Sequence, residues 1–275
     1  MTFGSLFAGI GGLDLGLERA GMECKWQVEI DPYCRAVLEK HWPEVPRWDD
    51  ATTFPPYPFD TRSPRARQRD EHEGKEAFSG DPFGKWRVDL ICGGFPCQPV
   101  SRAGQRRGLQ DERWLWGEFA RIIRLVAPRY VLVENVSGIL DRALAQVLGD
   151  LSDLGFDAEW GTLPAAFFGA PHYRGRVFVV AYAHTEGRQD TAWRSGQAES
   201  PRWRILTPTA LESRSQHWPS EPTVGRVVHG VSGWMVERLG NAVVPQVAEW
   251  IGRRILEADE ALRFGVRTGT VEVGR

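Results

Sequence analysis

Residues 2–21 read TFGSLFAGIGGLDLGLERAG, and this stretch decides the fold class. A β-prone run at 2–7 leads into the glycine-rich turn 8–12, after which the leucine-rich segment 13–20 predicts a helix that Gly21 ends. A second strand is expected soon after that glycine. A strand, a glycine turn, a helix and a strand in this order are typical of nucleotide-binding α/β domains, because glycines let the backbone turn tightly and approach a nucleotide.

The alternation of strands and helices continues along most of the chain and predicts an α/β fold. The expected architecture is a Rossmann-like, largely parallel sheet with helices on both faces. The further strands are expected at 25–30, 88–92, 130–134 and 176–182, and the further helices at 32–41, 115–126, 139–154 and 243–255.

Two stretches interrupt this alternation. Residues 61–84 are polar and charged with almost no apolar periodicity, so they predict a loop insertion. Residues 184–230 are rich in arginine, serine, proline and tryptophan, which predicts a small inserted module. We therefore divide the chain into a main domain at 1–183, the module at 184–230, and a segment at 231–275 that returns to the main domain.

The composition is that of a globular protein, since the 275 residues are 42% hydrophobic and 25% charged. No apolar run approaches the ~20 residues of a membrane span, and the first residues have no basic segment or cleavage site, so we expect no secretory signal. Four cysteines without a CxxC pattern predict neither a disulfide scaffold nor a metal site, and they favour a reducing cytoplasm.

The net charge of −2 does not by itself indicate a nucleic-acid partner. All but four of the 34 basic residues are arginine, which suits phosphate and base contacts, although GC-rich coding gives the same bias.

The glycine turn favours an adenosine ligand without a pyrophosphate. A dinucleotide fingerprint needs a third glycine where Asp14 stands, so S-adenosylmethionine fits the pattern better than NAD. Glu29 ends the second strand, where an acid holds ribose hydroxyls, and Ile30 beside it is suited to pack on an adenine face. A plain turn between a strand and a helix, followed by a surface acid, explains the same residues.

The segment 93–99 reads GGFPCQP and follows directly after the strand that ends near Cys92. Its cysteine, Cys97, lies between two prolines at the carboxyl edge of a parallel strand, where α/β enzymes place their chemistry. Because each proline fixes its own φ, we expect the thiol to be held in position. A free cysteine is more often a small buried residue, and Cys92 inside the strand fits that alternative.

Charged residues accompany two later strands. Glu134 opens the tripeptide Glu-Asn-Val after the strand 130–133, whose carboxyl end is expected on the same edge as Cys97. A carboxyl shielded from water near a thiolate has a raised pKa and can act as an acid, and the alternative is a helix-capping acid. Arg174 and Arg176 stand two residues apart at the start of a later strand, so both point to one face. They can grip a phosphate or a base carbonyl, and the alternative is a solvated strand entry.

Five motifs stand in the order found in cytosine-C5 DNA methyltransferases, and the chain resembles that family over nearly its whole length, except 61–84 and 184–230. The pair of Pro-Cys-Gln and Glu-Asn-Val is highly specific. The resemblance implies a Rossmann-like methyltransferase sheet with a small inserted target-recognition domain at 184–230. The motifs are SLFAGIGG at 5–12, GFPCQ at 94–98, ENV at 134–136, RGR at 174–176 and LGNAVVP at 239–245.

The resemblance implies a catalytic role for four residues. Cys97 matches the nucleophile that attacks C6 of a cytosine flipped out of the duplex. Glu134 matches the glutamate that contacts N3 and the exocyclic amine and stabilises or protonates the ring. Arg176 matches the arginine that holds the cytosine O2, with Arg174 in support. C5 then takes the methyl group of S-adenosylmethionine.

The resemblance also implies a cofactor site and contacts with DNA. Asp50 matches the acceptor of the adenine amine, although Asp49 is adjacent and the assignment can slip by one. The stretch 98–113 resembles a loop that closes over DNA, with contacts from Gln98, Ser101, Arg102 and Arg106. The expected contacts with S-adenosylmethionine are Phe7, Gly9, Ile10, Gly12, Glu29, Ile30, Asp50, Ala51, Leu115, Asn241 and Val243.

Two positions depart from the family pattern. His172 stands where the arginine motif usually opens with glutamine, and Ser5 replaces an acid that often precedes Leu-Phe. The recognition region at 184–230 is short, which suggests a short target, but its sequence does not reveal which one.

The sequence thus favours a DNA (cytosine-5-)-methyltransferase that acts on double-stranded DNA as a monomer, without a metal or a membrane. We expect it in a bacterial or phage-encoded setting, in the cytoplasm and at the nucleoid through DNA, alone or in a restriction–modification system. A tRNA cytosine-C5 methyltransferase of the same family has the same motifs, and the lack of a recognisable tRNA-specific insert favours DNA. A non-catalytic DNA-binding relative is the third alternative, which the presence of Cys97, Glu134 and Arg176 disfavours.

Overall fold

The computed structural model describes residues 1–56, 83–96, 114–183 and 241–264. Within them, one seven-stranded sheet has the strand order β3-β2-β1-β4-β5-β7-β6. The first five strands in this order are parallel, and β7 is antiparallel to both of its neighbours. The strands are β1 (Thr2–Leu6), β2 (Glu23–Val28), β3 (Arg47–Trp48), β4 (Leu90–Gly93), β5 (Tyr130–Asn135), β6 (Phe156–Pro164) and β7 (Gly175–Ala183).

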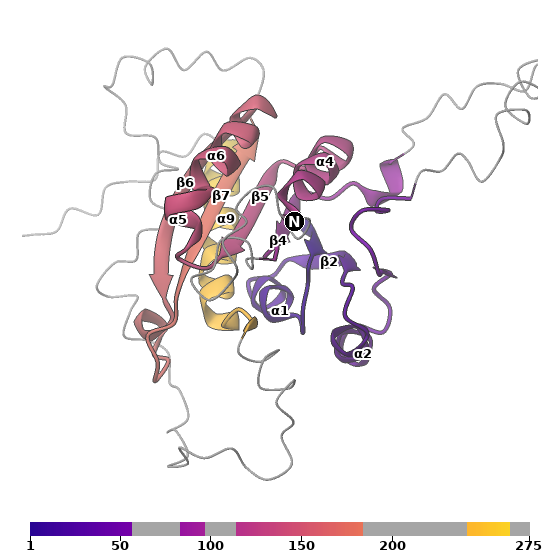
Figure 1. Ribbon diagram of the computed structural model, residues 1–275, viewed down its shortest axis with the longest axis horizontal. Coiled ribbons are helices and arrows are strands. Elements are labelled where there is room, and N and C mark those ends of the chain that lie inside the picture. The colour runs from indigo at the N-terminus through magenta and orange to yellow at the C-terminus, as the bar shows by residue number, and fades with distance from the viewer. Residues whose placement is uncertain (57–82, 97–113, 184–240, 265–275) are drawn as a thin grey trace, which may run out of the picture.

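Helices pack on both faces of this sheet (Figure 1). On one face, α4 and α6 bury Phe119 and Val147 against strand residues such as Val131. On the other face, α1 and α9 bury Leu17 and Ile251 in a second core. The helices are α1 (Gly12–Arg19), α2 (Pro32–His41), α4 (Trp116–Val126), α5 (Ile139–Arg142), α6 (Leu144–Asp153) and α9 (Pro245–Phe264), with short 3-10 turns η1 (Gly84–Trp86) and η3 (Ala165–Phe168).

Helix α9, the last one described, packs closely against α1, the first one. A Cβ added to Gly16 of α1 would lie 2.4 Å from Cβ of Ala248, and one added to Gly252 of α9 would lie 2.8 Å from Cβ of Ala20. Both distances are shorter than any ordinary contact, so these positions need glycine for the helices to approach this closely. The residues that precede α9 are thereby held beside the glycine turn that precedes α1.

The α/β fold class with a largely parallel sheet is confirmed, and the structure corrects three details. The segment 139–154 forms two helices, because Ala143 leaves helical geometry at φ −146°. The last helix begins at Pro245 and runs to Phe264, beyond the expected end at 255. Strands β3 and β6 were not expected: β3 has only two residues, and β6 is an edge strand in which Asp157, Glu159 and Thr162 interrupt the apolar residues. The module at 184–230 and nearly all of the insertion at 61–84 lie outside the described residues.

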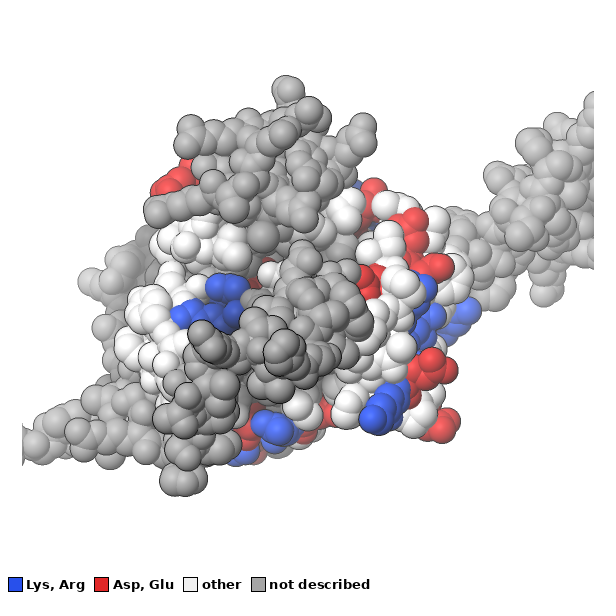
Figure 2. Space-filling view, turned by 60° about the horizontal axis from the view of Figure 1, so that its bottom comes forward, with Lys and Arg blue, Asp and Glu red and all other residues white. Residues whose placement is uncertain are grey.

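The surface carries charges of both signs. Figure 2 shows Lys and Arg side chains interspersed with Asp and Glu over the described part of one face, in keeping with the net charge of −2. In the ranges that the structure describes, no helix is long and apolar enough to cross a membrane.

Candidate active site

The topology of the sheet brings the predicted catalytic segments to one edge. β4 and β5 are parallel, so Gly93 and Val133 pair near their carboxyl ends. β7 runs the other way, so its beginning lies at that same edge, where Val177 pairs with Asn135. The reversal of β7 is therefore what carries the arginine motif at 174–176 to the Glu-Asn-Val segment.

At this edge Glu134 and Arg176 form a buried ion pair. Nε of Arg176 lies 3.0 Å from Oε1 of Glu134, and the two side chains are 19% and 10% exposed. Burial raises the pKa of Glu134 to about 7, although the positive charges of Arg176 and Arg174 oppose this rise. At neutral pH Glu134 therefore sits near its midpoint and can donate or accept a proton.

The backbone that leads toward Cys97 lies against this ion pair. A Cβ added to Gly94 would lie 2.6 Å from Oε2 of Glu134, so the carboxyl occupies the space that a larger residue would fill. Nδ2 of Asn135 donates a hydrogen bond to the carbonyl oxygen of Phe95 at 3.3 Å. Asn135 was not among the expected site residues, and its place beside Glu134 in the Glu-Asn-Val tripeptide was the available signal. Asn135 links the end of β5 to the Phe-Pro segment that follows β4.

Several predicted site residues fall outside the described ranges. These are the candidate nucleophile Cys97 and the expected DNA contacts Gln98, Ser101, Arg102 and Arg106. The described range 83–96 ends at Pro96, one residue before the cysteine, so the geometry of the thiol remains a prediction.

The cysteines that the structure describes, Cys24, Cys34 and Cys92, are all buried. Burial raises the pKa of the Cys24 and Cys92 thiols far above the usual range, so neither is a thiolate at neutral pH. The expectation that Cys92 is a small buried residue is confirmed.

Arg174 lies beside the ion pair but makes its own hydrogen bond elsewhere. Its backbone has φ 35°, in the left-handed region that is uncommon for a residue other than glycine. Its Nη2 donates to the carbonyl oxygen of Ala242 at 2.5 Å. Arg174 thus connects the arginine motif to the segment that precedes α9, and it acts on Glu134 through its charge.

The glycine turn after β1 is shaped by left-handed residues and by Glu29. Phe7, Gly9 and Gly11 have φ values of 53°, 57° and 85°. Oε2 of Glu29 accepts a hydrogen bond from the Gly9 amide at 2.7 Å, and Oε1 accepts one from the Asp31 amide at 2.8 Å. Burial raises the pKa of Glu29 above its ordinary value, while these two backbone hydrogen bonds oppose the rise. Glu29 therefore fixes the turn and keeps further lone pairs for hydroxyl donors.

Two more of the expected cofactor contacts lie next to this turn. Ile30 directly follows Glu29 and is 71% exposed, which is unusual for isoleucine and leaves an apolar surface open to a flat ligand. A Cβ added to Gly12 would lie 2.3 Å from the carbonyl oxygen of Val243, so the segment before α9 packs directly on the turn.

A cavity of about 470 Å³ opens between the glycine turn and the segment before α9. It combines three of the expected cofactor contacts with Arg174 of the arginine motif and the nearby His172. The lining residues are Ile10, Gly11, Gly12, Leu15, Glu18, His41, Trp42, His172, Arg174, Ala242, Val243, Val244 and Pro245.

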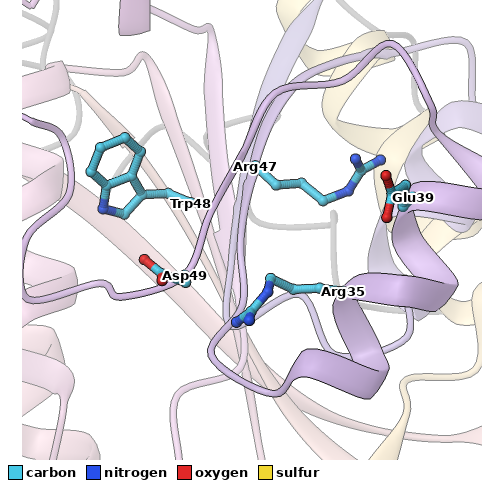
Figure 3. Close-up of a pocket in the computed structure, with 5 residues that line it drawn as sticks. All are labelled: Arg35, Glu39, Arg47, Trp48 and Asp49. Atoms are coloured by element: carbon cyan, nitrogen blue, oxygen red, sulfur yellow. The ribbon is translucent and has the colours of Figure 1, made fainter.

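Asp49 and Asp50 occupy different surroundings. Oδ1 of Asp50 accepts hydrogen bonds from the backbone amide and the hydroxyl of Thr52, at 2.8 and 2.7 Å, so this carboxylate shapes the turn after β3. Asp49 instead lines a separate hollow of about 450 Å³ between α2 and β3 (Figure 3). The other residues that line this hollow are Arg35, Glu39, Arg47 and Trp48. The assignment of the adenine contact to Asp50 remains a prediction.

The remaining expected contacts are distributed around the same end of the sheet. Leu115 immediately precedes α4 and is half-buried, while Ala51 is buried in the turn after Asp50. Asn241 is exposed at the start of the last described segment. In the part of the chain that the structure describes, no group of three or more His, Cys, Asp or Glu residues is arranged to hold a metal ion.

Comparison with known proteins finds a matching family model and several curated relatives. The family model described as C-5 cytosine-specific DNA methylase matches residues 1–223. Type II methyltransferase M.DsaV of Dactylococcopsis salina is 30% identical over 66% of this chain and 46% of its own length. Type II methyltransferase M.Eco47II of Escherichia coli is 35% identical over 64% of this chain and 38% of its own length. The chain thus matches less than half the length of either relative. Among solved structures, a mutant of DNMT2 from Spodoptera frugiperda aligns with a TM-score of 0.48 and 21% identity, over 68% of this chain and 51% of that chain.

Proposed function

The chain belongs to the C-5 cytosine-specific DNA methylase family, and from this premise we propose that it methylates C5 of cytosine in a specific sequence of double-stranded DNA. The type II methyltransferases among its relatives support a DNA substrate and a role in modifying DNA in a bacterial cytoplasm. We further propose that S-adenosylmethionine is the methyl donor and that the target cytosine is flipped out of the duplex.

The observation that carries this proposal is the buried ion pair of Glu134 and Arg176. It lies at the carboxyl edge of the sheet, against the backbone that leads from Gly94 to Cys97. An acid whose pKa is raised to about 7 by burial, next to a guanidinium, suits a pyrimidine ring that has to be protonated at N3 while its O2 is held.

The described residues around the glycine turn fit S-adenosylmethionine. Glu29 keeps lone pairs for the ribose hydroxyls, Ile30 offers an apolar face to adenine, and the left-handed turn at Gly9 and Gly11 brings the backbone close. The absence of a third glycine at Asp14 agrees with a ligand that has no pyrophosphate. When bound, S-adenosylmethionine supplies a methyl group on a positively charged sulfur, which makes that methyl electrophilic.

The residues of the chain then act on the cytosine. The Cys97 thiolate forms a bond to C6 while Glu134 delivers a proton to N3, so the electrons of the C5–C6 double bond become available at C5. Arg176 neutralises charge at O2 and keeps Glu134 oriented. After C5 is methylated, loss of the C5 proton, departure of the Cys97 thiolate and return of the N3 proton to Glu134 restore the neutral aromatic ring. Gln98, Ser101, Arg102 and Arg106 are proposed to hold the DNA beside this site.

Trapping of a covalent adduct tests this chemistry. DNA that contains 5-fluorocytosine in many sequence contexts should form a denaturation-resistant adduct in the presence of S-adenosylmethionine, because fluorine cannot leave C5 as a proton does. Cys97→Ser should bind S-adenosylmethionine normally and form no adduct. Cys34→Ser, a buried cysteine on α2, is the matched control and should form the adduct. An adduct with the Cys97→Ser protein, or none with a wild-type protein that methylates DNA, would overturn the proposal.

A further inference from the structure

We infer that Arg121 of α4 is a positioning residue that holds the turn at 50–54 in the shape needed to bind the adenine end of S-adenosylmethionine. The inference rests on the proposed function, since it concerns the same cofactor site. Its basis is a set of hydrogen bonds between two parts of the chain that are 67 to 70 residues apart in sequence.

The guanidinium of Arg121 converges on backbone carbonyls of this turn. Its Nη2 lies 2.8 Å from the carbonyl oxygen of Ala51 and 2.6 Å from that of Phe54. A longer contact of 3.4 Å reaches the carbonyl oxygen of Thr52. Hydrogen bonds from a charged donor are stronger than neutral ones, and a planar guanidinium can serve several acceptors at once.

Arg121 is itself fixed from its own helix. Its Nε donates to Oε2 of Glu118 at 2.6 Å, one turn earlier on α4, and both side chains are about one-third exposed. The guanidinium is therefore held in one orientation before it reaches the turn. Since α4 begins directly after Leu115, the same helix carries one expected cofactor contact and supports two others, Asp50 and Ala51.

The turn is also anchored at its end and at its beginning by other contacts. Phe54 is fully buried and packs on Trp26 with ring centroids 4.7 Å apart, so the end of the turn is fixed in the core. The beginning of the turn, at Asp50, is held by local hydrogen bonds with Thr52 and Thr53. Without Arg121, the carbonyl oxygens of Ala51 and Phe54 lose their side-chain donor, so the turn that presents Asp50 is held less firmly against α4.

Binding of S-adenosylmethionine by Arg121 variants tests this inference. Arg121→Gln is expected to weaken cofactor binding by about 10- to 100-fold, as the removal of a partner that orients a metal ligand weakens metal binding. Arg121→Lys should recover part of this loss, because ammonium keeps the charge but not the fork of donors. Arg124→Gln, an exposed arginine on the same helix, is the matched control and should bind like the wild type.

A double-mutant cycle with Asp50→Ala separates positioning from general damage to the fold. If Arg121 acts through Asp50, Arg121→Gln should change the dissociation constant of the Asp50→Ala protein by less than about threefold. Thermal unfolding of each variant shows that the folded protein is being measured. Equal binding by wild type and Arg121→Gln, or fully additive effects in the cycle, would overturn the inference. Failure of the wild-type protein to bind S-adenosylmethionine would instead overturn the proposed function.

Discussion

Glu134→Gln replaces the acidic member of the buried ion pair with a neutral side chain of nearly the same shape. It removes the proton that we propose for N3 of the cytosine, and it leaves Arg176 without a charged partner. General acid catalysis contributes about 10²- to 10⁴-fold to a rate, which corresponds to roughly 3 to 5 kcal/mol at 1.36 kcal/mol per factor of ten. The methyl-transfer rate of the variant should fall within this range.

The same substitution affects stability, and this effect has to be measured separately. Breaking a buried ion pair by removing one partner costs about 3–5 kcal/mol in free energy of unfolding. Because both side chains are at least four-fifths buried and glutamine still accepts a hydrogen bond, we expect a loss near the lower end of that range. Unfolding in urea measures this loss, and activity is then assayed at a temperature where the variant is fully folded.

The assay is single-turnover transfer of a labelled methyl group from S-adenosylmethionine to genomic DNA, from pH 6 to about pH 9. Burial raises the pKa of Glu134 to about 7, so its protonated fraction should fall about tenfold per pH unit above neutrality. The thiolate fraction of Cys97 rises over the same range, so the wild-type rate should level off above neutral pH. Glu134→Gln should instead keep rising with pH, because only the thiol then titrates. Glu260→Gln, an exposed residue on α9, is the matched control. A Glu134→Gln rate within threefold of the wild type, with the same levelling above neutral pH, would refute the role of Glu134 as the acid.

Three further predictions follow from other contacts. Burial raises the pKa of Asp14 to about 6 from 3.8, so the folded state binds its proton more tightly than the unfolded state does. The contribution of Asp14 to stability should therefore fall by about 2 kcal/mol as the pH rises from 4 to 6, and Asp14→Asn should remove this contribution in urea titrations at several pH values. Gly94→Ala puts a Cβ 2.6 Å from Oε2 of Glu134. It should reduce the single-turnover rate at least about tenfold and the free energy of unfolding by less than about 2 kcal/mol. An unchanged rate would mean that the carboxyl of Glu134 can move without affecting catalysis. Asp259→Asn weakens the contacts of α9 with Arg129 and with the Tyr130 hydroxyl. Because Arg129 is 42% exposed, the substitution should cost about 1–2 kcal/mol in stability while leaving cofactor affinity unchanged, as unfolding and equilibrium binding would show.

Elements with local signals were predicted well from the sequence. The helix at 32–41 begins and ends where it was expected, because Oδ1 of Asp31 caps the Cys34 amide at 3.0 Å and Pro32 occupies the first turn. The strand expected at 130–134 is fully buried, as its continuous apolar run indicates. In these cases, neighbouring residues carry all the information that the element needs.

Features that depend on distant parts of the chain were not predictable in this way. The direction of β7 is set by pairing with β5 and β6, and no local pattern in 175–183 reveals it. That direction nevertheless decides that Arg176 reaches Glu134. The contact of Arg121 with Ala51 and Phe54 is likewise invisible in the sequence, where Arg121 is one arginine among many on an amphipathic helix. The ion pair itself was not predicted, since the family resemblance implied only that Glu134 and Arg176 both act on the cytosine.

The most direct test of the account is transfer of a labelled methyl group from S-adenosylmethionine to genomic DNA and, separately, to bulk tRNA, followed by nucleoside analysis. We predict label in 5-methylcytosine from DNA and none in tRNA. Label in tRNA alone would contradict the DNA substrate while leaving the chemistry of Glu134 and Arg176 in place. No label in either nucleic acid, from a protein that is folded and binds the cofactor, would contradict catalysis itself.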